Sequence, residues 1–162
     1  MIKLYVTILG LGFIPLASGT IGSIVGVFSW IALTEIFQPQ IILALTIIVF
    51  FVSWISTEIY VRQKNDNEHD PSEVIIDELI GQWVGLTPIL FLHFFHHSPT
   101  NTQFTILIFI SFLLFRFFDI VKPWPINVID RQTNSFSILF DDIVAGFFSS
   151  ICITIYLSWA YL

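Results

Sequence analysis

Residues 104–121 read FTILIFISFLLFRFFDIV, an apolar run that carries Arg116 and Asp119 near one end. Its length is close to the roughly 20 residues that a helix needs to cross the hydrocarbon core of a bilayer. An ionised side chain in that core costs at least about 2.5 kcal/mol, so charges placed there usually serve a function. This run therefore predicts a membrane helix with a polar site at its end.

Four more apolar segments of similar length accompany this run. They cover, approximately, Ile21–Phe37, Ile41–Tyr60, Val74–Phe95 and Ile138–Tyr161. The composition agrees, because 56% of the 162 residues are hydrophobic and 11% are charged, against roughly 25% charged residues in soluble domains. We therefore expect one all-α integral membrane domain over residues 1–162, a polytopic bundle of about five transmembrane helices.

The N-terminal segment combines a basic start with an apolar stretch that reaches Ala17. Lys3 followed by apolar residues is also typical of a secretory signal peptide. Gly10, Gly12 and Pro15 interrupt the stretch, however, and no clear cleavage site precedes a soluble domain. We expect a retained segment that lies along the membrane surface or re-enters the membrane.

The basic residues indicate how the chain is oriented. If the five segments cross the membrane alternately, the opposite connections, around Pro39 and over 96–103, carry no lysine or arginine. Because positive residues favour the cytoplasm, the basic side is predicted to be cytoplasmic. The residues on that side, or at helix ends that face it, are Lys3, Arg62, Lys64, Arg116, Lys122 and Arg131.

Acidic residues within or beside the apolar segments gather on the same side. Adjacent helical residues point about 100° apart, so one carboxylate of each neighbouring pair can face the bundle interior while the other supports it. Clustered oxygens suit Mg²⁺, which keeps several waters and bridges to phosphate. The alternative for a single pair is a favourable interaction with the helix dipole. The acidic residues are Asp77, Glu78, Asp119, Asp130, Asp141 and Asp142, and all except Asp130 are predicted metal ligands.

Two further motifs favour a phosphate ligand. Arg116, Asp119 and Lys122 are spaced along one helical stripe, where the two cations can bind phosphate oxygens beside the acid; interfacial snorkelling is the alternative. At the start of the first span, small residues expose backbone N–H groups that can bind an anion, unless Ser18 or Thr20 caps that helix. The predicted phosphate-binding residues there are Gly19, Thr20, Gly22 and Ser23.

These motifs together resemble the phosphatidylglycerophosphatase A family, and the resemblance covers nearly the whole chain. Ser18 stands where that family has a proline. The stretches that carry the resemblance are Gly19–Ser23, Ile76–Gly81, Phe115–Ile126 and Asp141–Gly146. The residues that match the family's polar positions are Asp77, Glu78, Arg116, Asp119, Lys122, Asp141 and Asp142.

The resemblance implies a Mg²⁺-dependent bacterial lipid phosphatase of the inner membrane. Its expected reaction removes the terminal phosphate of phosphatidylglycerophosphate to give phosphatidylglycerol, at the cytoplasmic face. The expected partners are this phospholipid and membrane lipid, not nucleic acid. The net charge of −6 would disfavour anionic headgroups, but a bound divalent cation inverts the local sign.

Two other functions fit parts of the pattern. A small ion-coupled transporter or channel also uses intramembrane carboxylates, but it would place them near the bilayer midplane rather than at one face. A CDP-alcohol phosphotransferase also clusters aspartates in membrane helices. Its longer Asp-x-x-Asp-Gly pattern followed by Ala-Arg is absent from this sequence.

Overall fold

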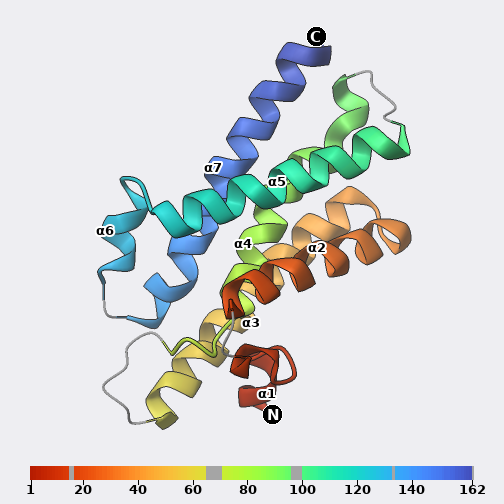
Figure 1. The fold of residues 1–162 in the computed structure, drawn as a ribbon. Helices are drawn as coiled ribbons and strands as arrows, with labels where there is room; N and C mark the ends of the chain where they lie inside the picture. Colours follow the sequence, from red (N-terminus) through yellow and green to blue (C-terminus); the bar gives the residue numbers. More distant parts are fainter. Residues whose placement is uncertain (15–16, 65–70, 96–99, 133, 162) are drawn as a thin grey trace.

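The computed structural model describes residues 1–14, 17–64, 71–95, 100–132 and 134–161, and all regular structure in these ranges is helical (Figure 1). The predicted all-α class is therefore confirmed. The elements are α1 Ile2–Val6, η1 Leu11–Phe13, α2 Ser18–Ile36, α3 Pro39–Lys64, α4 Ile76–Leu86, η2 Thr87–Phe95, α5 Asn101–Val121, α6 Ile126–Asp130 and α7 Ser135–Tyr161.

Four of these helices, α2, α3, α5 and α7, are long and apolar enough to cross a membrane. Large apolar side chains project outward from them, such as Phe28 on α2, Phe109 on α5 and Ile155 on α7, each more than half exposed. A soluble protein rarely exposes contiguous apolar surface on this scale. This surface belongs in lipid, and the chain is a membrane protein.

The connection between α2 and α3 is as short as the sequence predicts. Helix α2 ends at Ile36, Phe37 is extended, and α3 begins at Pro39. Proline suits the first position of a helix because its missing N–H would have no partner there. The first two spans therefore form a tight helical hairpin.

The apolar segment 74–95 is helical from Ile76 onward but is not one straight α-helix. Its α-helical part, α4, ends at Leu86, and the chain continues as the 3₁₀ element η2 with a kink at Phe91. The change follows from Pro88, which has no N–H to donate to the carbonyl of Val84. The Thr87 hydroxyl donates to that carbonyl instead, at 2.7 Å.

Helix α4 is the centre of the bundle. Nine of its 11 residues are buried, and it packs against α2, α3, α5 and α7. Glycines bring backbones into contact there: a Cβ on Gly146 would lie 2.2 Å from the carbonyl oxygen of Gly81. The Ser111 hydroxyl of α5 donates to the Gly85 carbonyl of α4 at 2.9 Å. Small residues and interhelical hydrogen bonds of this kind hold membrane helices together.

Helix α5 ends where the proline-rich stretch predicts. Lys122 adopts the left-handed conformation and its N–H donates to the Phe118 carbonyl, and Pro123 then prevents continuation. The short helix α6, which the sequence analysis did not predict, follows. Its Ile126 is fully buried against Phe115 of α5 and Ala145 of α7, so the turn is anchored to the bundle.

The N-terminal segment packs beside α3. The hydroxyls of Tyr5 and Ser53 are hydrogen-bonded at 2.9 Å, and Ile75 donates its backbone N–H to the Val6 carbonyl at 3.0 Å. Ser53 lies 11 residues before Lys64, the last residue of α3, which corresponds to about 16 Å along the helix. The N-terminal segment therefore packs against the side of α3 rather than beyond its end.

The contact between α4 and α7 generates a first prediction. Gly146→Val should lower the stability of the protein by about 1–3 kcal/mol, because the added side chain meets the Gly81 backbone and the helices must separate. The measurement is thermal unfolding in detergent. Phe147→Val, at a half-exposed neighbouring position, is the control and should change stability little. Equal melting temperatures for wild type and Gly146→Val would contradict the prediction.

Candidate active site

The polar residues converge at one end of the bundle, where α2, α4 and α7 begin and α5 ends (Figure 1). A pocket of about 210 Å³ opens there. Its polar walls come from four separate helices and the loop before α4, so only the folded bundle assembles it. The lining residues are Ser18, Ser72, Val74, Asp77, Glu78, Asp119, Lys122, Ile138, Asp141 and Asp142.

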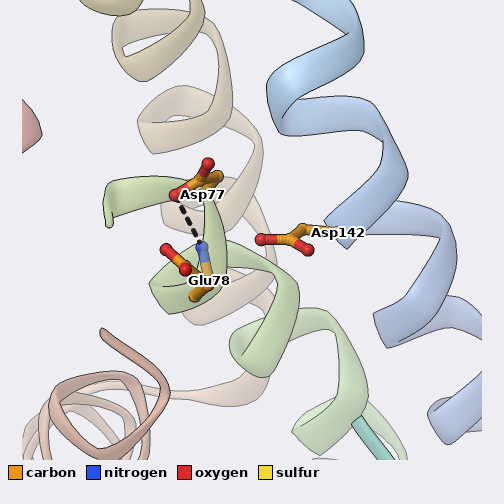
Figure 2. A group of neighbouring side chains, drawn as sticks. All are labelled: Asp77, Glu78 and Asp142. Atoms are coloured by element: carbon orange, nitrogen blue, oxygen red, sulfur yellow. Dashed lines mark hydrogen bonds between the residues drawn. The ribbon is translucent and has the colours of Figure 1, made fainter. Parts of the chain in front are cut away.

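Three carboxylates face one another across this pocket. Asp77 and Glu78 extend from the first turn of α4, and Asp142 points toward them from α7 (Figure 2). One oxygen from each lies within 4.8 Å of the other two. Asp77 and Asp142 are buried, and the Glu78 N–H donates to Asp77 Oδ1 at 3.1 Å. Both members of the first acidic pair therefore turn inward, but only Asp142 of the second pair joins this group.

The group fits a hard divalent cation. Buried carboxylates this close repel one another strongly unless a positive charge lies between them. Glu78 Oε2 is buried and has no hydrogen-bond partner among the described residues. An oxygen-only donor set with such an atom is the chemistry that Mg²⁺ or a similar ion requires.

Arg116 connects α5 to α2 beside this group. Its Nη1 pairs with Asp119 Oδ2 at 2.5 Å, one turn along α5, and donates to the Ser23 hydroxyl of α2 at 3.3 Å. Gly19 makes room for the guanidinium: a Cβ there would lie 3.2 Å from Arg116 Nη1 and 2.4 Å from Glu78 Oε1. Glycine at position 19 thus allows Arg116 and Glu78 to approach the same point.

Lys122, at the end of α5, links α6 and α7. Its ammonium group donates to Asp141 Oδ2 at 2.7 Å and also to Asp130 of α6. Burial alone would lower the pKa of Lys122, but the hydrogen bonds with Asp130 and Asp141 outweigh it, and the pKa rises above the ordinary lysine value. Lys122 is therefore a fixed positive charge at neutral pH.

The loop before α4 is held to the end of α3. Glu73 Oε1 accepts a hydrogen bond from the Tyr60 hydroxyl and pairs with Lys64, each at 2.9 Å. Burial opposes ionisation of Glu73, but these bonds keep its pKa below the usual value. The fixed loop places Ser72 and Val74 on the pocket wall.

The predicted phosphate-binding residues of α2 divide into two groups. Gly22 and Ser23 are buried against neighbouring helices, with a Cβ on Gly22 only 2.7 Å from the Ile75 carbonyl oxygen. Gly19 and Thr20 lie in the first helical turn and are half-buried. The residue before the helix is Ala17, which makes no side-chain capping bond, so capping by Ser18 or Thr20 is not what positions this turn.

Sequence reasoning missed two polar pocket residues, Ser18 and Ser72, and the apolar lining residues Val74 and Ile138. Ser18 had a signal, because it replaces a proline at the edge of a motif that was itself predicted to bind phosphate. Ser72 had none, since it stands in a polar loop whose position depends on the contacts of Glu73 with α3. Asp130 contacts Lys122 from outside the pocket lining.

Comparisons with known proteins give a consistent result. A family model described as phosphatidylglycerophosphatase A matches residues 4–157. A Bacteroides thetaiotaomicron protein with the provisional name phosphatidylinositol-3-phosphatase is 31% identical over 148 residues, covering 90% of this chain and 87% of its own. Phosphatidylglycerophosphatase A of Escherichia coli is 30% identical over 87% of this chain and 74% of its own.

The corresponding Haemophilus influenzae protein, also named phosphatidylglycerophosphatase A, is 32% identical over 89% of this chain and 81% of its own. No solved structure matches the chain. The family match extends over almost the whole sequence and includes every residue of the pocket. The chain therefore belongs to the phosphatidylglycerophosphatase A family and is a membrane-bound phosphatase.

Proposed function

We propose that this protein is a Mg²⁺-dependent phosphatidylglycerophosphatase, which hydrolyses the terminal phosphate monoester of phosphatidylglycerophosphate to phosphatidylglycerol and phosphate in phospholipid biosynthesis. The observation that carries the proposal is the meeting of Asp77, Glu78 and Asp142 in a pocket that also holds Lys122. Family membership supplies the reaction class.

The carboxylates divide between two tasks. Oxygens of Asp77, Glu78 and Asp142 would hold Mg²⁺, with Asp119 and Asp141 on the same pocket as the other predicted ligands. Bound there, the ion would offset the charge of the phosphate monoester and of the transferring phosphoryl group. Asp119 and Asp141 also hold the two basic side chains in place: Asp119 pairs with Arg116, and Asp141 pairs with Lys122.

The cationic side chains bind the nonbridging oxygens of the substrate phosphate. Arg116 presents a planar guanidinium suited to phosphate, and Lys122 adds a point charge from the other side. The first turn of α2 contributes backbone N–H groups from Gly19 and Thr20, with the Ser18 hydroxyl beside them. Gly22 and Ser23 support this turn through their packing on the neighbouring helices.

Asp119 is the residue we assign to the attacking water. Its Oδ2 is held by Arg116, which fixes the carboxylate on the pocket wall. Water oriented by this carboxylate attacks phosphorus and passes one proton to Asp119, which returns it to solvent. The bond from phosphorus to the glycerol oxygen breaks, and that oxygen takes up a proton from solvent. Attack by an aspartate, with an aspartyl-phosphate intermediate, is the alternative form of the same step.

The proposed location is the bacterial inner membrane with the pocket on the cytoplasmic side. Lys64, Arg116 and Lys122 all lie at the pocket end of the bundle, in line with the preference of basic residues for the cytoplasm. A transport function is not favoured, because the acids lie at the helix ends rather than along the length of the spans.

The central experiment measures phosphate release by purified protein in mixed micelles. The substrates are phosphatidylglycerophosphate, phosphatidic acid, lysophosphatidic acid and phosphatidylinositol 3-phosphate, the last because of the Bacteroides relative's name. We expect the first to be hydrolysed fastest, with no release after chelation of divalent cations. Preference for another lipid would replace the proposed substrate while keeping the phosphatase class.

Neutralising single carboxylates should stop this reaction. Asp77→Asn, Asp119→Asn and Asp142→Asn should each lower kcat by about 100-fold or more, the usual loss when a group that stabilises transition-state charge is removed. Glu35→Gln, at the exposed far end of α2, is the matched control and should keep wild-type turnover. If all three aspartate variants stay near wild-type activity, this pocket is not the active site.

Metal binding can be measured without activity, through the melting temperature. Asp142→Asn should raise the melting temperature of the metal-free protein, because it removes one of three repelling carboxylates. Added Mg²⁺ should stabilise the wild type, by about 2.7 kcal/mol at 100 times the dissociation constant, and stabilise the variant much less. An equal Mg²⁺ effect on both proteins would place the ion elsewhere.

A further inference from the structure

A groove of about 460 Å³ runs between α2 and α5 on the outer surface of the bundle. Ile24, Val27 and Phe28 form its α2 wall, and Phe109 and Phe112 lie on its α5 wall. Thr105 is the one polar side chain among its described lining residues. Both helices are long and apolar enough to span a membrane, so this groove opens toward lipid.

The groove lies on two of the helices that line the active-site pocket. Ser18 of α2 and Asp119 of α5 line the pocket. The hydrogen bond from Arg116 to Ser23 then joins the helices, at 3.3 Å. Ile24 follows Ser23 directly, and Phe112 lies about one turn from Arg116. From the pocket end, both helices therefore present the pocket, the Arg116–Ser23 bridge and the groove in the same order.

We propose that the α2–α5 groove binds an acyl chain of the phospholipid whose terminal phosphate occupies the pocket. This inference rests on the proposed function and adds a site for the apolar part of the substrate. The Arg116–Ser23 contact lies between pocket and groove, where the polar part of the lipid must pass. The positive Arg116 guanidinium there complements the negative charge of the lipid headgroup. An apolar chain then continues into a groove whose walls are apolar.

The distance between the two sites fits the proposed substrate. Ser18 to Ile24 is six residues, about 9 Å along α2, and Asp119 to Phe112 is seven residues, about 10 Å along α5. In phosphatidylglycerophosphate, nine bonds separate the terminal phosphorus from the central carbon of the diacylglycerol, about 10 Å when a chain advances about 3.5 Å for every three bonds. The acyl chain therefore begins where the groove begins.

The same distance separates lipid classes. In phosphatidic acid only three bonds, about 3.5 Å, join phosphorus to that carbon. With its phosphate in the pocket, its acyl chains would therefore begin beside the polar Arg116–Ser23 contact rather than at the groove. A lipid with an inner phosphodiester can span both. Arg116, between Asp119 and Phe112 on α5, lies between the pocket and the groove.

A second apolar groove, of about 380 Å³, provides the comparison. It lies between α3 and α7 and is lined by Trp54, Ile55 and Phe136, with the carboxylate of Glu58 among them. Among the described residues that line the active-site pocket, none comes from α3. The negative side chain of Glu58 disfavours a substrate phosphate there, so the α3–α7 groove is expected to hold ordinary bilayer lipid.

The test compares groove variants on two substrates. Ile24→Trp and Val27→Phe fill the α2–α5 groove, and Ile55→Trp fills the α3–α7 groove as the matched control. Each protein is assayed in mixed micelles with Mg²⁺, on dioleoyl phosphatidylglycerophosphate and on its deacylated, water-soluble headgroup. We expect kcat/KM for the dioleoyl lipid to fall about tenfold or more in both α2 variants, through KM, as when a hydrophobic pocket is obstructed.

On the deacylated headgroup, the same two variants should stay within about twofold of wild type, because that molecule has no chain to place in the groove. Ile55→Trp should match wild type on both substrates. Equal losses on both substrates would mean that the variants distort the pocket, and no loss would mean that the groove holds only bilayer lipid. Either result, or an equal effect of Ile55→Trp, overturns the inference. A wild-type protein inactive on both substrates would instead refute the proposed function, and the inference with it.

Discussion

The close approach of α4 to α7 is the constraint on which the rest of the structure depends. Gly81 and Gly146 bring the two backbones into contact, and a Cβ on Gly81 would also lie 2.7 Å from the Asp142 carbonyl oxygen. Asp77 stands four residues before Gly81, and Asp142 stands four residues before Gly146, about one turn in each case. The glycine contact therefore sets the depth at which carboxylates from two separate helices meet.

The charges at this end of the bundle are arranged so that the cations stay fixed without neutralising the three-carboxylate group. Arg116 is held by Asp119, and Lys122 by Asp130 and Asp141. Such buried or half-buried pairs add little net stability, because the cost of removing both charges from water offsets their attraction. Their value is positional: one pair keeps Lys122 on the pocket lining and the other keeps Arg116 beside it, where a phosphate dianion would bind.

Much of this arrangement was predictable from local sequence, because apolar length, Pro39 and Pro123 determine where helices run and end. The gathering of the acidic residues at one end of the bundle followed from the assumption that successive segments cross the membrane in alternating directions. Which of Asp141 and Asp142 joins the three-carboxylate group could not be predicted. It depends on the rotation of α7 about its axis, and α7 begins at Ser135 rather than near Ile138. The role of Gly19 was equally hidden, since it depends on Glu78 and Arg116 from other helices. The break at Pro88 had a local signal, which the apolar run obscured.

A phosphatase that acts on a lipid must serve two solvents, because its phosphate product belongs in water and its acyl chains belong in the membrane. In this fold α2 and α5 serve both. Their ends line a polar pocket, and their next two turns form an apolar groove, with the Arg116–Ser23 contact between them. Helix α4 has no such lipid-facing groove of its own, since nine of its 11 residues are buried. The division follows from burial: the central helix supplies two of the three clustered carboxylates, and α2 and α5, which reach lipid, form the apolar groove.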